Sequence, residues 1–351
     1  MSAVTASIAG FWGIIPRPLR IVISRLAMLV PQMFGVMMVT FLLVRMLPGD
    51  PALLLLGNMA TPETIASFRK RLGLDLSIWE QFVLYVWNAL HGDLGTSILT
   101  SNPVTTDLME RAPATLELIT YAMILTILVG VTMAVISVVR AGGAVDVGSR
   151  VYGLAAGAIP DFWVGLLLIY FFFYVLGWAP APFGRIDTFV SAPPTVTGFY
   201  TIDSLIAGDL PAFFSSAGRL ILPVATLAIV NAGALMKMTK TVFADVYRSD
   251  FIRHARASGL PERVIRRMAL RNSLPPIITL VGFLVGFLLG AAVLVETIFA
   301  WGGLGQYAVQ SVVNSDYPAL QGFVLVAAAF ILTVYTVVDI LYELADPRIR
   351  V

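Results

Sequence analysis

Six long apolar stretches constrain the fold of this chain more than any other feature. Each is close to the ~20 residues that a helix needs to cross a bilayer. Lipid offers no hydrogen-bond partners to the backbone, so open-ended segments that span it must be helical. Of the 351 residues, 58% are hydrophobic, whereas soluble domains have about 45–50%. We therefore expect an all-α membrane protein with six transmembrane helices, at residues 21–47, 116–139, 151–177, 220–243, 277–299 and 319–341.

Basic residues are distributed unequally between the two sides of this six-span arrangement. Sixteen of the 23 lysines and arginines fall on the side of both termini and five on the other side, leaving out Arg45 and Arg219 at span ends. Lysine and arginine are enriched on the cytoplasmic side of membrane proteins. We therefore predict a multi-pass inner (plasma) membrane protein with both termini in the cytoplasm. Its parts are a cytoplasmic tail (1–20), a first helix (21–47), an extracytoplasmic loop (48–115), a five-helix core (116–343) that contains a cytoplasmic loop (245–273), and a second tail (344–351).

The long extracytoplasmic loop contains two predicted helices. In "TPETIASFRKRLG", Thr61 has the residue type of an N-cap, Pro62 suits the first helical position and Gly73 suits the end. The next stretch, "SIWEQFVLYVWNAL", starts at the N-cap candidate Ser77 and carries an apolar stripe at helical spacing. These two helices are predicted to form a small cap over the outer mouth of the bundle or to lie in the membrane interface.

The sequence contains no pattern that would support catalysis or bind a cofactor. There are no cysteines and only two histidines, so a metal site built on these residues is disfavoured. The chain has no nucleotide-binding P-loop, no H-E-x-x-H zinc motif and no G-x-S-x-G nucleophile motif. We expect no catalytic residue, no metal and no cofactor in this chain. A transport function is favoured over an enzymatic one. The chain is then either a subunit of a larger transport complex or a secondary transporter or channel.

Few ionisable residues fall inside the predicted spans, where each is costly unless it faces protein or water. Asp161 follows Pro160, and Glu296 lies near the end of the fifth span. With the polar Asn231, these residues are candidates for lining an aqueous translocation pathway. For Glu296 the alternative is solvation at the outer surface, and for Asp161 the alternative is a span that starts later than residue 151.

The connection between the fourth and fifth spans, Tyr247 to Pro276, carries seven arginines. We predict one helix that ends at Gly259, and a second, amphipathic helix that begins at Pro261 and ends at Leu274-Pro275-Pro276. The arginines suit a helix on anionic lipid, but a lipid-bound helix has no need of the small residues before Gly259. These small residues permit close approach by another protein and favour a docking site. Nucleic-acid binding is disfavoured because both ends of the segment are tethered to the bilayer.

The stretch "FIRHARASGLPERVIRRMALRNSLPP" resembles the cytoplasmic EAA loop of ABC transporter permeases, in the version found in dipeptide and oligopeptide (DppB/OppB-type) importers. Other stretches resemble the same family in the same order. They are "RMLPGDPALLLLG", "RAPATLELI", "IPDFWVGLLL", "ETIFAWGGLGQ", "SDYPALQG" and "LADPRIR".

This resemblance implies a type I ABC importer permease that translocates short peptides or similar solutes by alternating access. It implies four partners, namely a second, homologous permease subunit, two P-loop ATPase subunits that hold ATP and Mg, and an extracytoplasmic solute-binding protein. The implied ATPase-coupling residues are Arg253, His254, Ala255, Arg256, Ala257, Ser258, Gly259, Leu260 and Pro261. The sequence departs from the family pattern in having Arg253 at the acidic position of the loop, Gly302 at a common proline, and Asp161 where a neutral residue is frequent.

Overall fold

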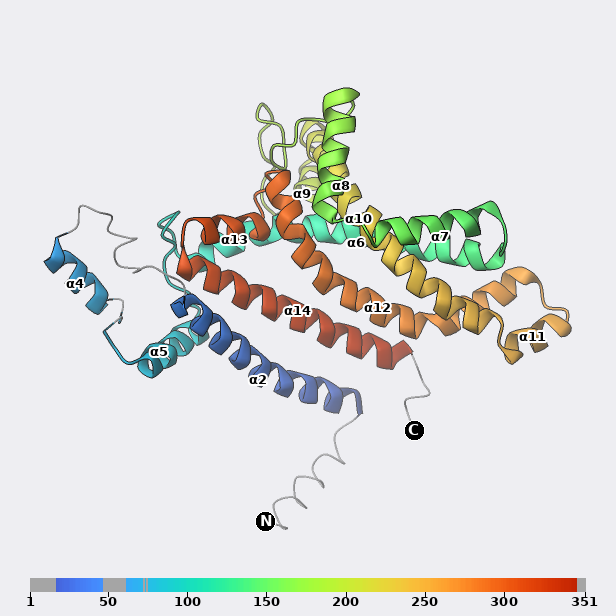
Figure 1. Ribbon diagram of the computed structural model, residues 1–351, viewed down its shortest axis with the longest axis horizontal. Coiled ribbons are helices and arrows are strands. Elements are labelled where there is room, and N and C mark those ends of the chain that lie inside the picture. The colour runs from blue at the N-terminus through green and yellow to red at the C-terminus, as the bar shows by residue number, and fades with distance from the viewer. Residues whose placement is uncertain (1–16, 47–60, 72, 74, 346–351) are drawn as a thin grey trace, which may run out of the picture.

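The computed structural model describes residues 17–46, 61–71, 73 and 75–345. The predicted terminal tails and the first part of the extracytoplasmic loop fall largely outside these residues. Five helices are long and apolar enough to cross a membrane, and they correspond to five of the six predicted spans. They are α2 (Arg17–Met46), α6 (Val104–Val139), α10 (Leu210–Tyr247), α12 (Glu262–Ile298) and α14 (Tyr317–Ala345) (Figure 1).

The third predicted span is broken rather than straight. Within residues 151–177 the chain leaves α7 (Ala144–Ala156), turns by 106° and enters α8 (Asp161–Leu168), which continues as the π-helical turn η1 (Ile169–Val175). Pro160 lies at the break. Proline has no N–H to donate and disfavours helical geometry in the residue before it, so it favours an interruption of the helix at this point. Counting this bent pair as one span gives the expected six.

Several helices extend beyond the predicted boundaries. The second span starts at Val104 instead of residue 116, and the fourth starts at Leu210 instead of residue 220. The predicted helix end at Leu274-Pro275-Pro276 is wrong, since α12 runs without interruption from Glu262 to Ile298. Prolines are tolerated inside membrane helices where neighbouring contacts compensate for the lost hydrogen bonds, and the flanking Ser273 and Ile277 are both buried here.

The two predicted helices of the extracytoplasmic loop are present as α4 (Pro62–Arg71) and α5 (Ile78–Leu90). Ser77 caps α5 in a reciprocal arrangement with Glu80, as its residue type predicts. The ring of Phe82 on α5 lies 5.4 Å from that of Phe41 on α2. Helix α5 is therefore attached to the first span, and both helices lie at the periphery of the bundle (Figure 1).

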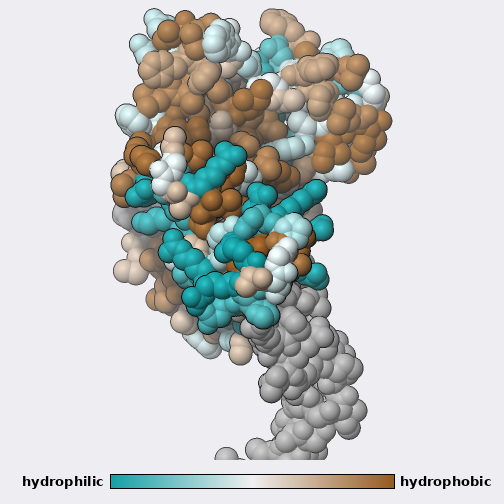
Figure 2. Space-filling view, turned by 90° about the vertical axis from the view of Figure 1, so that its right-hand side faces the viewer, coloured by the Kyte–Doolittle hydropathy of each residue, from teal (hydrophilic) through white to brown (hydrophobic). Residues whose placement is uncertain are grey.

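The remaining helices mark the two ends of the bundle. Helices α9 (Tyr200–Ala207) and α13 (Leu304–Val313) lie where α6 and α10 begin. Helix α11 (Asp250–Ala257) lies at the other end, where α10 ends and α12 begins. We call this second end the basic end, because it carries Arg140, Arg248 and the arginines of α11 and early α12. Figure 2 views the molecule from this side and shows hydrophilic side chains gathered around α11.

Candidate functional site

Helix α11 is held against the basic end of the bundle by a small apolar cluster. Ile252 is buried and packs with Phe243 of α10 and with Ile265 and Ala269 of α12. Ala255, one of the candidate coupling residues, is also buried and therefore faces away from solvent. The other candidate residues, Arg253, His254 and 256–261, are exposed.

Gly259 forms the sharp turn between α11 and α12. Its φ of +77° lies in the left-handed region that glycine adopts without strain. A Cβ placed on Gly259 would meet nothing within 4 Å, so the space beside this residue is open. Leu260 after the turn and Val264 in the first part of α12 are exposed apolar residues among the arginines. An exposed surface that combines apolar side chains with arginines suits the docking of a protein partner.

Glu262 connects the three helices that meet at this turn. Its carboxylate accepts hydrogen bonds from the hydroxyl of Tyr247 at 2.9 Å and from Nε of Arg256 at 2.8 Å. The Arg256 guanidinium also lies over the Tyr247 ring, 5.3 Å from its centroid. The hydrogen bond to Glu262 raises the pKa of Arg256 above its ordinary value. These contacts connect the end of α10, the end of α11 and the start of α12 on the exposed side of the turn.

Asp161 and Asn231 lie together at the break in the third span. Asn231 is buried midway along α10, and its Nδ2 donates to Asp161 Oδ1 at 3.3 Å and to the carbonyl of Leu227 at 2.7 Å. Asp161 is the first residue of α8, and its side chain is partly exposed. Among the residues that the structure describes, no lysine or arginine forms an ion pair with it.

The break itself is pressed closely against α10. A Cβ on Gly233 would lie 2.3 Å from the Cβ of Ala156, so only glycine permits this approach of α7 to α10. The hydroxyl of Tyr152 on α7 donates a hydrogen bond to the carbonyl of Ile229, which lies one helical turn before Gly233 on α10. The arrangement places a carboxylate and an amide at an irregular, mid-bundle segment, the kind of place where transporters form solute sites.

Glu296 lies apart from this pair, at the end of the bundle opposite the basic end. It is fully buried, and its carboxylate accepts hydrogen bonds from the Thr115 hydroxyl at 2.6 Å and from the backbone N–H groups of Gly305 at 2.8 Å and Gln306 at 3.1 Å. The first N–H groups of a helix have no hydrogen-bond partner within the helix. Here the carboxylate of Glu296 is that partner for two of the first N–H groups of α13. In this conformation its carboxylate is buried and caps a helix.

Two of the three glycines of "WGGLGQ" make room for this cap. A Cβ on Gly303 would lie 2.5 Å from Thr115 Oγ1 and 2.6 Å from Glu296 Oε2, and a Cβ on Gly305 would lie 2.5 Å from the Cα of Val293. These glycines therefore serve close packing around a buried carboxylate.

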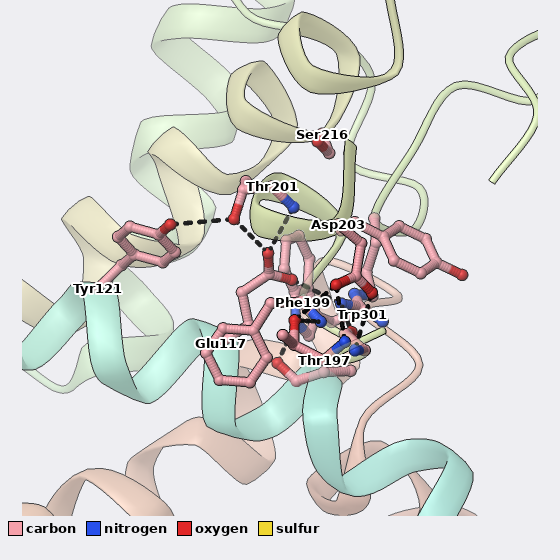
Figure 3. A network of polar contacts seen from close by, with 12 residues as sticks. Glu117, Tyr121, Thr197, Phe199, Thr201, Asp203, Ser216 and Trp301 are labelled. Atoms are coloured by element: carbon pink, nitrogen blue, oxygen red, sulfur yellow. Dashed lines mark hydrogen bonds and ion pairs between the residues drawn. The ribbon is translucent and has the colours of Figure 1, made fainter. Parts of the chain in front are cut away.

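A second buried carboxylate, which the sequence analysis did not single out, organises the loop before α9 (Figure 3). Glu117 on α6 is 1% exposed and pairs with Nη2 of Arg185 at 2.6 Å. It also accepts hydrogen bonds from the backbone N–H of Thr201 at 2.9 Å and from its hydroxyl at 2.6 Å. Arg185 donates further to the carbonyl of Gly198 at 2.7 Å and lies 3.7 Å from the centroid of the Tyr200 ring.

Asp203 completes this network from within α9. It accepts hydrogen bonds from the backbone N–H groups of Val196, Thr197 and Gly198 and from the Thr197 hydroxyl. Burial works to raise the pKa of Asp203, but these hydrogen bonds outweigh it and hold the pKa below the usual range. The sequence contains one sign of this network, which is the presence of an acidic residue, Glu117, at the start of the predicted span 116–139.

Among the described residues, no group of three or more histidine, aspartate or glutamate side chains is arranged to hold a metal ion. The structure therefore offers two candidate functional regions, which are the turn at the basic end and the break at Asp161.

Comparison with known families covers nearly the whole chain. The family model described as "Binding-protein-dependent transport system inner membrane component" matches residues 126–351. A second model, described as "Binding-prot-dependent transport system membrane comp, N-term", matches residues 18–119.

Individual relatives are similar over almost their full length. The chain is 40% identical to the di/tripeptide transport system permease protein of Pseudomonas aeruginosa, over 95% of this chain and 99% of the relative. It is 41% identical to the probable D,D-dipeptide transport system permease protein of Escherichia coli K12, over 90% and 93% of the two chains. It is 37% identical to the dipeptide transport system permease protein of the same organism, over 95% and 99%.

Proposed function

The chain belongs to the family of binding-protein-dependent transport system inner membrane components, and we propose that it is the permease subunit of an ATP-driven importer of short peptides. The relatives reported above are named for the transport of dipeptides and tripeptides. The observation that carries the proposal is the exposed turn at Gly259, which lies between α11 and the start of a 37-residue helix, α12. A force applied at this turn would act directly on a membrane-spanning helix.

In the proposed complex, the chain acts with a second, homologous permease, two P-loop ATPase subunits and an extracytoplasmic solute-binding protein. ATP and Mg belong to the ATPase subunits. The basic end and both termini lie in the cytoplasm, as the enrichment of lysine and arginine supports. The exposed face formed by Arg253, His254 and residues 256–261 receives the ATPase, with Ala255 anchoring it from behind. Closure of the ATPases then switches the pathway between inward-facing and outward-facing states.

We propose that the pathway passes the break in the third span. A short peptide in water carries an ammonium group at one end and a carboxylate at the other. Asp161, which has an amide neighbour but no cationic one among the described residues, is suited to an ammonium group that passes it. Asn231 holds the carboxylate in place from the buried side. For Glu296 we propose a structural role, because its carboxylate is already occupied by the cap of α13.

The proposed function is tested by purifying the tagged chain and by measuring uptake into vesicles. We expect a P-loop ATPase to co-purify, and uptake of a dipeptide to require ATP and the binding protein. A secondary transporter or channel is the other candidate class. Uptake at an unchanged rate without ATP, from a chain that brings down no ATPase, would establish that class instead.

Replacing Asp161 by Asn should slow peptide uptake at least about tenfold, since hydrogen bonds to charged groups contribute about 1.5–3 kcal/mol. Uptake is measured in vesicles with saturating binding protein. Asp245→Asn is the control, because Asp245 is an exposed acid near the basic end of α10 and lies far along that helix from Asn231. Equal uptake by the Asp161→Asn and Asp245→Asn variants, for several peptides, would exclude Asp161 from the pathway.

A further inference from the structure

A groove lies between α2, α12 and α14 in the half of the bundle nearer the basic end, separate from both regions discussed above. Its volume is about 230 Å³. Helix α14 forms its floor, and α2 and α12 form its walls; Figure 1 shows α14 running between these two helices. All three helices are long and apolar enough to cross a membrane, so a groove between them lies at membrane depth.

An ion pair stands at the mouth of the groove. Nη2 of Arg25 on α2 lies 3.2 Å from Oδ2 of Asp339 on α14, and both side chains are less than half exposed. Arg25 lies eight residues after the start of α2, and Asp339 lies six residues before the end of α14. In the sequence Arg17 and Arg20 precede Arg25, and Glu343 follows Asp339. Charged residues gather at the ends of membrane spans, which places both charges near the depth of the lipid headgroups. The ion pair uses Nη2 of Arg25 and Oδ2 of Asp339. The guanidinium has five N–H donors and the carboxylate has two oxygens, so N–H groups of Arg25 and Oδ1 of Asp339 are left to bind a ligand.

Away from the ion pair, apolar side chains form the larger part of the lining of the groove. Met28 and Leu29 lie on α2, Phe283 on α12 and Leu332 on α14. The polar groups among them are those of Gln32, Thr279, Tyr335 and Thr336. The floor is closed because α12 and α14 touch at Gly282, where an added Cβ would lie 2.6 Å from the side chain of Val338. A ligand that fits must have a charged head at the mouth and an apolar body below it.

We propose that this groove binds one amine-headed phospholipid, with its phosphate against Arg25, its ammonium group against Asp339 and part of one acyl chain beside Leu29 and Phe283. The choice follows from charge complementarity. A headgroup with a phosphate and no amine would satisfy Arg25 but would bring its negative charge against Asp339. A free polar solute would leave the apolar wall uncovered, and a packed helix would need no ion pair at this depth.

The test uses the assembled complex in bilayer nanodiscs made with equal amounts of phosphatidylethanolamine and phosphatidylglycerol. Native mass spectrometry then counts the lipids that stay bound. A basic residue near a membrane surface contributes about 1 kcal/mol to binding lipid phosphate, so Arg25→Gln should lower retained phosphatidylethanolamine about fivefold. Asp339→Asn should remove the preference for phosphatidylethanolamine over phosphatidylglycerol. Arg140→Gln is the matched control, since Arg140 is an exposed arginine of the basic end outside the groove, and it should change neither quantity.

A second variant tests the groove with its ion pair left intact. Thr279 lines the α12 wall, and Thr279→Trp should fill the space and displace the lipid, while peptide-dependent ATP hydrolysis reports whether the complex is still assembled. A photoreactive phosphatidylethanolamine should label peptides of α2, α12 and α14 in the wild type and lose that labelling in this variant. Equal retention of both lipids with no effect of Arg25→Gln would overturn the proposal. So would cross-linking that places a helix of a partner subunit in the groove.

Discussion

Replacing Gly259 by Trp is expected to abolish ATP hydrolysis that depends on the loaded binding protein, while the chain still inserts into the membrane. The left-handed backbone of Gly259 would cost a tryptophan about 1–2 kcal/mol. The larger side chain would not collide with the rest of this subunit at its Cβ, because a Cβ on residue 259 meets nothing within 4 Å. The indole would instead stand on the face that we propose contacts the ATPase. Co-purification of the ATPase subunits and the stimulated hydrolysis rate measure the effect.

Gly142 provides a closely matched control for this substitution. It lies between α6 and α7 at the same end of the bundle, has a φ of +79°, and a Cβ there also meets nothing within 4 Å. Gly142→Trp therefore introduces the same side chain with the same backbone strain outside the proposed docking face, and should leave stimulated hydrolysis close to wild type. Wild-type hydrolysis in Gly259→Trp, or equal losses in both variants, would count against docking at the turn.

Much of the fold could be predicted from the sequence because membrane insertion depends on a property that is local in the chain. A run of apolar residues reports a span by itself, and six spans were predicted in this way; five are single long helices and the other is a bent pair. The caps of α4 and α5 were also predictable, since Thr61 and Ser77 bond to backbone groups only three residues away. Such interactions need no knowledge of the rest of the molecule.

The features that sequence reasoning missed depend on packing between distant segments. The apolar run 151–177 is continuous, and hydropathy cannot show that it bends at Gly157–Pro160; the proline was the only local sign. In α12 the opposite occurred, because Pro275 and Pro276 suggested a boundary where buried neighbours keep the helix intact. A proline thus marks a possible break, and the surrounding contacts decide whether the helix ends there.

The same limit applies to the candidate sites. Glu296 was interpreted as a pathway residue from its place in an apolar span, but its partners are Thr115, 181 residues earlier, and the N-terminus of the following helix. Nothing in the sequence pairs these groups. Asp161 and Asn231 were both candidates, and the structure places them in contact although 70 residues separate them. Their proposed role in the pathway depends on the vesicle measurement.

Among the ion pairs in the described part of the chain, the pair between Arg185 and Glu117 should cause the largest loss of stability when only one partner is replaced. Glu117 is 1% exposed and the Arg185 side chain is 10% exposed, so water compensates neither charge well. Breaking a buried pair by removing one partner typically costs about 3–5 kcal/mol, because an uncompensated charge stays behind. Arg185→Met should therefore lower the free energy of unfolding by about this amount, measured by denaturant titration of the purified protein.

Two further variants separate this charge effect from simple loss of contacts. The double variant Arg185→Met, Glu117→Gln removes both charges, keeps an oxygen that can accept from Thr201, and should recover a large part of the lost stability. Asp75→Asn breaks the exposed pair with Arg69, where the two charged groups lie 3.8 Å apart, and should cost less than about 1 kcal/mol. If the double variant is as unstable as Arg185→Met alone, the network acts through the hydrogen bond from Arg185 to the Gly198 carbonyl and the stacking on Tyr200, rather than through neutralisation of Glu117.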